Sequence, residues 1–417
     1  MTDYQAMEDR SSMGILTKRD VVIVRGSGTR VWDSEGKEYI DCIAGHGTAN
    51  VGHSHPVVVD AVARQAKRLM SCPEAFYNDI RAKLGTALCQ EAAPIGLSRL
   101  FLCNSGTEAV EAALKFARVV TGRTGVIAAQ RGFHGRTFGA LSATWNPKYR
   151  KPFEPLLPGF THVLYNDVEA MDKAIDDRTA AVILEIVQGE GGVRLASSEY
   201  LKRVETFCRE RGALFIVDEV QTGFGRTGAL FASQHHDLRP DILCLAKAMA
   251  GGLPVGAVLC SDSVKEIPAM SHGTTFGGSP VICAAALATL SVIKNERLVE
   301  HAEVSGTYFR DRLRAISAPG IREIRGMGLM VGVELKGRVT PVLRGLMERS
   351  VMALPAGNTV LRFLPPLSIT SEDIDQVTDA LKEVLSSLEA SPRVRSNKQG
   401  GRRRHSTAGE LGSGESG

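Results

Sequence analysis

The stretch LFIVDEVQTGFGRTGALFASQHHDLRPDILCLAKAMAGG, residues 214–252, contains two apolar runs that each end in a charged residue. The run LFIV ends at Asp218, and the run ILCLA ends at Lys247. Short apolar runs of this kind are typical of strands buried in a parallel sheet. Because ligands of open parallel sheets bind at the carboxyl ends of the strands, Asp218 and Lys247 are predicted to face one bound molecule.

Strand-like and helix-like segments alternate on both sides of this stretch, from about residue 84 to residue 256. The apolar runs LFLCN, GVIAAQ, AVILEIV, ALFIVDEV and ILCLA are separated by amphipathic patterns such as TEAVEAALKFARVV and SEYLKRVETFCRERG. This order predicts an α/β fold in which a parallel sheet is covered by helices on both faces.

A second, smaller lobe is predicted from the two ends of the chain. The N-terminal runs VVIVRGSG and TRVWDSEGKEYIDCI have the Gly-bearing turns of a strand meander. After Pro280, one long helical stretch at residues 281–316 precedes a strand-like run, IREIRGMGLMVGVEL, and a final helix at residues 372–388. We therefore predict an N-terminal part of the small lobe, a large cofactor-binding domain, the remaining small domain and a disordered tail, at residues 1–50, 51–285, 286–389 and 390–417.

The net charge of +4 comes from the C-terminal tail. Residues 391–417 contain six Lys/Arg and two Glu, so the rest of the chain is neutral. A neutral body gives no electrostatic case for nucleic acid, and a tail of Gly, Ser and Arg with few apolar residues predicts disorder. We interpret the tail as a solvated extension, with a binding arm as the alternative.

The cysteines and the N-terminus indicate a cytoplasmic protein. The 8 cysteines form no C-x-x-C pair, and most have apolar neighbours, as is typical of buried thiols in a reducing compartment. The N-terminal MTDYQAMEDRSSMG lacks the apolar region of a signal peptide, and no run reaches the length of a membrane span. We expect no membrane partner.

The segment LFLCNSGTEAVEAALKFAR predicts an anion site at the start of a helix. A strand ends at Asn104, the turn Ser105, Gly106, Thr107 follows, and Glu108 lies in the first helical turn. Backbone N–H groups at such a helix end bind phosphate. This segment has neither the G-x-G-x-x-G pattern of a dinucleotide site nor the Gly-Lys-Ser/Thr ending of a P-loop, which favours a single phosphate. An ordinary helix cap is the alternative explanation.

Three further segments supply an aromatic ring and charges. GFHGRT contains Phe133, which can stack on a flat ring, and Arg136, whose planar fork suits a carboxylate. Arg362 interrupts the apolar strand TVLRFLPPL, where an unpaired guanidinium is costly, and Glu190 in VQGEGG is its natural partner. Taken singly, the Phe133 segment is also explained as a surface loop, and Glu190 as a solvated turn residue.

Together these residues describe one ligand. Asp218 can keep a ring nitrogen protonated, Gln221 lies near enough in sequence to reach a ring oxygen, and Lys247 can attack a carbonyl when burial lowers its pKa. With a phosphate site and a stacking ring, this set predicts pyridoxal 5'-phosphate, whose ring accepts electrons. His53 and His55 lack the further ligands of a metal site, so no metal is predicted.

Seven motifs, in this order and spacing, resemble the class III pyridoxal-phosphate aminotransferases over roughly residues 14–389: NSGTEAVEAALKFAR, GFHGRT, VQGEGG, VDEVQTGFGRTG, PDILCLAKAMAGGLPVGAV, HGTTFGGSP and LRFLPPL. Within that class the chain resembles most the acetylornithine and acetyl-lysine aminotransferases, and especially the branch that acts on lysine or ornithine held on an amino-group carrier protein. That branch has stretches similar to AGHGTANVGH, SATWNPKYRKPF and IRGMGLMVGVELK. The resemblance implies fold-type I, with a mostly parallel seven-stranded sheet in the large domain.

The resemblance also implies how the cofactor is held. Lys247 would bind it covalently, Asp218 would bond the pyridine nitrogen, and Gln221 would reach the ring hydroxyl. Thr275 would reach the phosphate of the neighbouring subunit, so a homodimer with shared active sites is implied. The remaining contacts, on the two ring faces and at the phosphate, would come from Phe133, Val220, Ser105, Gly106 and Thr107.

The substrate contacts implied by the resemblance involve three charged residues. Arg362 would bind the α-carboxylate of glutamate, and Arg136 would bind its distal carboxylate. Glu190 would pair with Arg362 when an ω-amine substrate is bound.

These expectations describe a transaminase of lysine or arginine biosynthesis. It would move the terminal amino group between an N-blocked diamino acid, either carrier-linked lysine or ornithine or acetylornithine, and the pair 2-oxoglutarate and glutamate. Another class III ω-amino acid aminotransferase, of the 4-aminobutyrate or ornithine type, and an aminomutase are the alternatives. An acidic amino-group carrier protein is a candidate partner.

Overall fold

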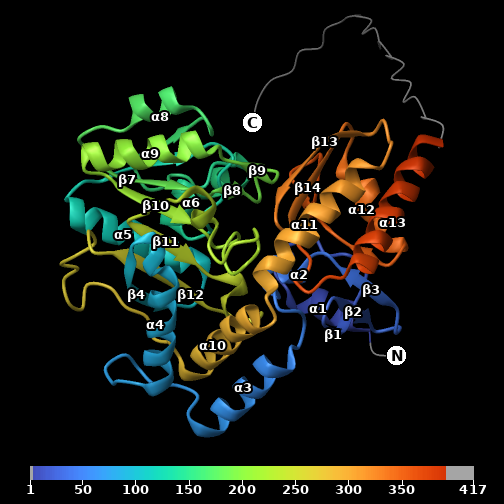
Figure 1. Cartoon of the computed structure of the whole chain (residues 1–417), viewed down its shortest axis with the longest axis horizontal. Helices are drawn as coiled ribbons and strands as arrows, with labels where there is room; N and C mark the ends of the chain where they lie inside the picture. Colours follow the sequence, from blue (N-terminus) through green and yellow to red (C-terminus); the bar gives the residue numbers. More distant parts are fainter. Residues whose placement is uncertain (1–2, 391–417) are drawn as a thin grey trace, which may run out of the picture.

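The computed structural model describes residues 3–390, so residues 391–417 of the predicted basic tail lie outside the described residues. Its largest sheet has seven strands, and two four-stranded sheets lie beside it (Figure 1). The α/β fold with a mostly parallel seven-stranded sheet and a smaller α+β part is therefore confirmed.

The large sheet has the strand order β4-β12-β11-β10-β7-β5-β6. Its strands are β4 (Leu97–Cys103), β5 (Gly125–Ala129), β6 (Phe160–Val163), β7 (Thr179–Leu184), β10 (Leu214–Asp218), β11 (Ile242–Leu245) and β12 (Gly256–Ser261). β12 runs antiparallel to both of its neighbours, and the other pairs formed by β10, β7, β5 and β6 are parallel. The sequence predicted five of the seven strands and missed β6 and β12. β6 has only four residues, two of them polar, and β12 follows a glycine-rich turn.

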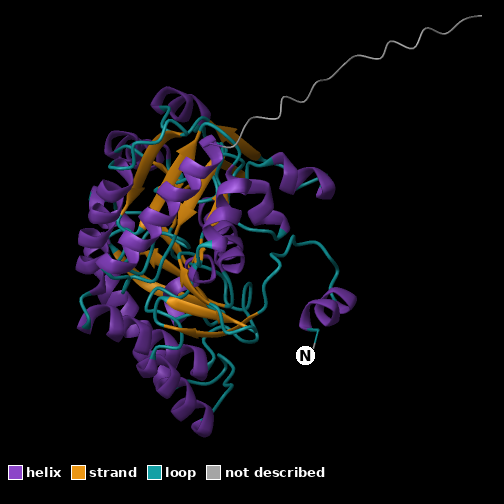
Figure 2. Cartoon of the chain, turned by 90° about the vertical axis from the view of Figure 1, so that its right-hand side faces the viewer, coloured by secondary structure: helices purple, strands orange, loops and turns teal. Residues whose placement is uncertain are grey.

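The central strands are buried on both faces, which explains their continuous apolar composition. In β7, Val182 and Leu184 contribute to one apolar cluster, whereas Ala181 and Ile183 contribute to another on the opposite face. Helix α5 (Gly106–Thr121) covers the second face with small alanines, and α9 (Ser198–Arg211) covers the first. Figure 2 shows helices on both sides of the strands.

The smaller part is formed by both ends of the chain. Strands β1 (Ile23–Ser27), β2 (Arg30–Asp33) and β3 (Glu38–Asp41) form a sheet with β15 (Val351–Met352), which pairs parallel to β3. The second four-stranded sheet is antiparallel and contains β13 (Ile321–Met327), β14 (Met330–Leu335), β17 (Val360–Phe363) and β16 (Leu354–Ala356). N-terminal strands therefore lie beside a segment from near the C-terminus.

The prediction of one helix over residues 281–316 is wrong. Two helices are present, α10 (Pro280–Asn295) and α11 (Leu298–Arg314), and the chain turns between them at Arg297, whose φ is 53°. Both helices are apolar on one side, so periodicity alone does not reveal a single left-handed residue. The predicted boundary at residue 285 falls inside α10, which packs against α3 (Pro56–Arg68) and α4 (Asp79–Ala92) of the large part. The four-part division of the chain stays a prediction.

Helix α1 (Tyr4–Ser11) has no buried residue and stands away from the body of the molecule (Figure 2). Within residues 3–390, none of the helices combines the length and apolar composition that a membrane span requires. The other helices and short strands are α2 (Ala44–Gly47), α6 (Phe138–Ala143), α7 (Pro147–Arg150), α8 (Val168–Ala174), α12 (Val339–Glu348), α13 (Ser371–Ala390), β8 (Val187–Gln188) and β9 (Arg194–Leu195), with 3-10 turns η1 (Ala93–Ile95), η2 (Lys151–Phe153), η3 (Ala232–His236) and η4 (Lys247–Ala250).

Candidate active site

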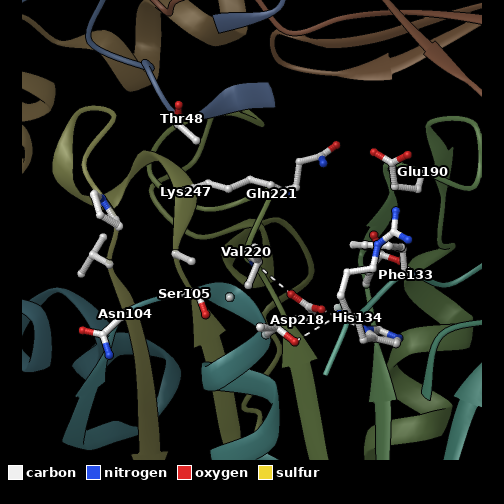
Figure 3. A pocket seen from close by; sticks show the side chains of 18 of the residues that line it. Thr48, Asn104, Ser105, Phe133, His134, Glu190, Asp218, Val220, Gln221 and Lys247 are labelled. Atoms are coloured by element: carbon white, nitrogen blue, oxygen red, sulfur yellow. Dashed lines mark hydrogen bonds and ion pairs between the residues drawn. The ribbon is translucent and has the colours of Figure 1, made fainter. Parts of the chain in front are cut away.

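A cavity of about 440 Å³ lies at the carboxyl ends of β10 and β11. In Figure 3, Ser105 and Asn104 lie on one side of it, and Phe133, His134 and Glu190 lie on the other. Most of the predicted site residues line this cavity: Ser105, Gly106, Thr107, Phe133, Arg136, Glu190, Asp218, Val220, Gln221 and Lys247. The structure thus brings together residues from widely separated segments of the chain.

Asp218 ends β10 and is only 4% exposed. Its Oδ1 accepts a hydrogen bond from the Val220 amide at 3.0 Å, and its Oδ2 lies 2.8 Å from Nδ1 of His134. Burial on its own lowers the pKa of His134, but the hydrogen bond and charge of Asp218 outweigh it, so that pKa is raised. The sequence analysis singled out the loop that contains Phe133, but it did not predict the contact between His134 and Asp218.

Glu185 is a second buried group that the sequence analysis missed. Its carboxyl oxygens accept hydrogen bonds from the Phe133 amide at 2.9 Å and the Gly189 amide at 3.2 Å. Burial raises the pKa of Glu185 to about 7, and the charge of nearby Asp218 acts in the same direction. A glutamate inside the apolar run AVILEIV is the signal that could have identified it.

Lys247 follows β11, immediately beside the strand that ends at Asp218. Its φ of 40° is a left-handed conformation that costs a lysine about 1 kcal/mol or more, and such conformations gather at functional sites. Desolvation lowers the pKa of its amine, although the charge of Glu190 opposes this. A lowered pKa increases the fraction of neutral, nucleophilic amine at physiological pH.

The N-terminus of α5 forms one wall of the cavity. Ser105 caps the helix by accepting a hydrogen bond from the Glu108 amide at 3.3 Å. A Cβ on Gly106 would lie 2.7 Å from Cγ1 of Val220, so this position needs glycine. Ser105 therefore forms an ordinary helix cap. The same helix end also faces the cavity, where its backbone N–H groups suit a phosphate.

Arg362 on β17 has a side chain that is 1% exposed. Its Nη2 lies 2.7 Å from Oε1 of Glu190, and its Nη1 donates to Oε1 of Gln221 at 3.2 Å. Its Nε has no hydrogen-bond partner among the described residues, so the guanidinium keeps a free donor. Burial opposes ionisation of Glu190, but Arg362 overcomes it and holds the pKa of that carboxyl below its usual range.

Arg136 and Thr275 are less enclosed than the other predicted residues. The Arg136 guanidinium lies 4.0 Å from the centre of the Tyr149 ring and 5.5 Å from that of Phe133. Thr275 is exposed and does not line the cavity, so one chain does not bring it to this site. The adjacent Thr274 accepts a hydrogen bond from Asn104 at 2.8 Å, which connects this loop to the start of α5.

These residues fit pyridoxal 5'-phosphate. Gly106 and Gly189 let the side chains of Val220 and Gln221 pack closely beside the cavity, because a Cβ at either glycine would collide with them. The cavity offers a helix end for a phosphate, Phe133 and Val220 for a flat ring, a carboxylate at Asp218 and an amine at Lys247. The fold and this set of side chains define a pyridoxal-phosphate-dependent enzyme. Across residues 3–390, no group of three or more His, Cys, Asp and Glu is arranged to hold a metal ion.

Comparison with known proteins identifies the family. The model of the family "Aminotransferase class-III" matches residues 15–385, and the chain belongs to this family. The predictions of the family, the enzyme class and the cofactor are therefore confirmed.

Relatives with assigned names cover nearly the whole chain. It is 49% identical to the [LysW]-aminoadipate semialdehyde transaminase of Deinococcus radiodurans over 92% of this chain and 90% of that one. It is 47% identical to the acetylornithine aminotransferase of Methanopyrus kandleri, over 93% and 100%. The solved ornithine aminotransferase of Toxoplasma gondii superposes with a TM-score of 0.89 at 38% identity, over 93% of this chain and 95% of that one.

Proposed function

We propose that this aminotransferase moves the terminal amino group between an N-blocked diamino acid and the pair 2-oxoglutarate and glutamate, in lysine or arginine biosynthesis. The blocked diamino acid is carrier-linked lysine or ornithine, or acetylornithine. The names of the relatives from D. radiodurans and M. kandleri support this class of amine donor. The observation that carries the proposal is the ion pair between the buried Arg362 and the partly buried Glu190.

This ion pair suits a site that must accept two different substrates in turn. Glutamate has a carboxylate beside the reacting amine, and the terminal amine of a diamino acid has none. With Glu190 on Arg362, the guanidinium is neutralised and a plain methylene chain can lie beside it. When glutamate binds, its α-carboxylate takes the place of Glu190, because a guanidinium left without an anion in this buried position is costly.

The residues around the cofactor have separate tasks in this proposal. Pyridoxal phosphate, when bound, supplies a ring that accepts the negative charge developing on the substrate carbon. Asp218 holds a proton on the ring nitrogen, and Lys247 anchors the cofactor and then moves a proton at the substrate carbon. Ser105, Gly106 and Thr107 hold the phosphate.

Single-turnover kinetics of the two half-reactions test the proposal. Arg362→Gln should slow amine transfer from glutamate about ten- to a hundredfold, because a charge-assisted contact to the carboxylate is lost. Transfer from acetylornithine should change much less. Equal losses in both half-reactions would contradict the exchange of Glu190 for glutamate, and the absence of glutamate formation from 2-oxoglutarate would favour an aminomutase.

We also propose a homodimer that works in the cytoplasm. The loop containing Thr275 carries an exposed phenylalanine, Phe276, which is 65% exposed and would be covered by a second subunit. All eight cysteines are free, which suits a reducing compartment. Light scattering should give twice the chain mass, and Thr275→Ala should weaken retention of the cofactor if this residue reaches the phosphate in the neighbouring subunit.

A further inference from the structure

Helix α5 and the loop that contains Arg136 are joined by a chain of three side chains. Oγ1 of Thr107 lies 2.8 Å from Oγ1 of Thr137, and the Thr137 hydroxyl donates to Oε1 of Glu111. Thr107 and Glu111 lie on α5, one helical turn apart, whereas Thr137 directly follows Arg136 in sequence. We call these three residues the threonine link. It connects the helix end that suits a phosphate to the loop of a proposed substrate contact.

The hydroxyl of Thr107 is fully used within this region. A hydroxyl has one proton to donate and two lone pairs that accept, and a carboxylate only accepts. Because the Thr137 proton goes to Glu111, the proton between the two threonines is that of Thr107. The oxygen of Thr107 also accepts from the amides of Arg136 and Thr137, each at 3.2 Å. The side chain of Thr107 therefore has no donor left for a cofactor phosphate.

The backbone around the threonine link is shaped to fit its side chains. A Cβ on Gly135 would collide with Oγ1 of Thr107, and a Cβ on Gly139 would collide with the Glu111 carboxylate. Oε1 of Glu111 also accepts a hydrogen bond from the Gly139 amide at 2.8 Å. The loop is thus held against α5 on both sides of Arg136, with glycine at the two points of closest approach.

Arg136 depends on this support of its backbone. Within residues 3–390, the interactions found for its guanidinium are those with the rings of Tyr149 and Phe133, whose centres lie 4.0 and 5.5 Å away. A ring face attracts a guanidinium but does not fix its direction as paired hydrogen bonds do. The direction in which the Arg136 side chain enters the cavity is therefore set chiefly by its backbone, which Thr107 holds.

We propose that Thr107 is a positioning residue for Arg136. Its hydroxyl holds the loop so that the guanidinium points to a carboxylate of the substrate, and the cofactor phosphate receives only the backbone N–H group of Thr107. This inference rests on the proposed function, in which Arg136 binds the distal carboxylate of glutamate. The amide of Thr107 then serves the cofactor, and its hydroxyl serves the substrate.

Thr107→Val tests this division because it removes the hydroxyl and keeps the shape of the side chain. In single turnovers of the holoenzyme, the glutamate concentration that gives half the maximal rate should rise about five- to tenfold, with the maximal rate within about twofold. The dissociation constant of pyridoxal phosphate, measured by equilibrium dialysis, should change by less than about twofold. Thr107→Ser, which keeps the hydroxyl, should behave as the wild type.

A double-mutant cycle shows whether Thr107 acts through Arg136. Arg136→Gln already lacks the guanidinium, so adding Thr107→Val should raise the half-saturating glutamate concentration by less than about twofold further. Hydrogen exchange of the cofactor-free protein is a readout independent of turnover. The amides of Arg136 and Thr137 should exchange about tenfold faster in Thr107→Val. Thr121→Val is the matched control, because this hydroxyl bonds the Ala117 carbonyl on α5 and does not line the cavity.

Three results would overturn the inference and leave the proposed function standing. These are weaker cofactor binding in Thr107→Val with unchanged glutamate saturation, additive losses in the double variant, and a Thr107→Ser that behaves like Thr107→Val. Unchanged glutamate saturation in Arg136→Gln would instead contradict the proposed contact to glutamate, and this inference with it.

Thr137→Val repeats the test if Thr107→Val does not fold. Thr137 does not line the cavity, and its loss breaks the threonine link at its centre. This variant should also raise the half-saturating glutamate concentration while the cofactor is retained. Normal glutamate saturation in Thr137→Val would count against the inference.

Discussion

The floor and the mouth of the active-site cavity are built in different ways. The floor consists of Asp218, His134 and Glu185, which lie at or after the ends of strands of one sheet and are all buried. The mouth consists of Arg136, Glu190 and Arg362, and Arg362 comes from a strand of the small antiparallel sheet. One sheet therefore positions the groups proposed for the cofactor, whereas the proposed substrate contacts depend on how two sheets are placed relative to each other.

The largest effect is expected next to the floor, at Lys247. Lys247→Ala removes the proposed covalent anchor, which is also the group proposed to move the proton, so turnover should fall by at least about 10⁴-fold. Steady-state glutamate formation measures this loss. Normal turnover by the variant would remove the basis for every role assigned to the cavity.

Asp218→Asn is the next most damaging change, and it tests the charge of the floor without changing its shape. The asparagine oxygen can still accept from the Val220 amide, but the negative charge proposed to hold a proton on the ring nitrogen is lost. We expect kcat to fall about 10²- to 10³-fold, in the range seen when one group that stabilises transition-state charge is removed. Both half-reactions should slow equally, in contrast to Arg362→Gln at the mouth.

The sequence predicted the floor and mouth residues that interrupt recognisable patterns. Asp218 and Lys247 end apolar strands, and Arg362 lies inside one, so each is an obvious exception to a local rule. The parallel arrangement of the strands then places strand ends at one edge of the sheet. For this reason the main sheet could be predicted, and together with the family resemblance the sequence named ten of the twenty residues that line the cavity.

Contacts that join distant segments could not be predicted in this way. His134 lies in a loop, and nothing in its neighbours shows that its ring meets Asp218 at 2.8 Å. Glu185 does interrupt an apolar run, but its two amide donors come from loops on either side of it. The turn at Arg297 depends on the packing of α10 and α11, which apolar periodicity does not describe.

Glu185→Gln should change how the free energy of unfolding of the cofactor-free protein depends on pH. Burial raises the pKa of Glu185 from 4.5 to about 7, so its proton stabilises the folded state below about pH 4.5 and this contribution is lost as the pH rises to about 7. The loss amounts to at most about 3 kcal/mol. Glutamine has no such proton to lose.

Thermal melts of the wild type and Glu185→Gln between pH 5 and pH 8 measure this difference. The melting temperature of the variant relative to the wild type should rise with pH, whatever constant offset the altered hydrogen bonds to Phe133 and Gly189 cause. Glu169→Gln, on the exposed surface of α8, is the control for removing a carboxylate. Parallel curves for the variant and the wild type would contradict a buried proton at Glu185.

The smallest effect is expected at the mouth, for Arg136→Gln. The Arg136 guanidinium lies on the Tyr149 ring and is exposed, so its attraction for a carboxylate is weakened by water and salt. The KM for glutamate should rise about tenfold with little change in kcat, because the contact is made equally in the bound and transition states. The cofactor should be retained as in the wild type, since the floor is untouched. Release of the cofactor by Arg136→Gln would contradict this separation of mouth and floor. It would mean that the loop from Phe133 to Arg136 makes the two regions depend on each other.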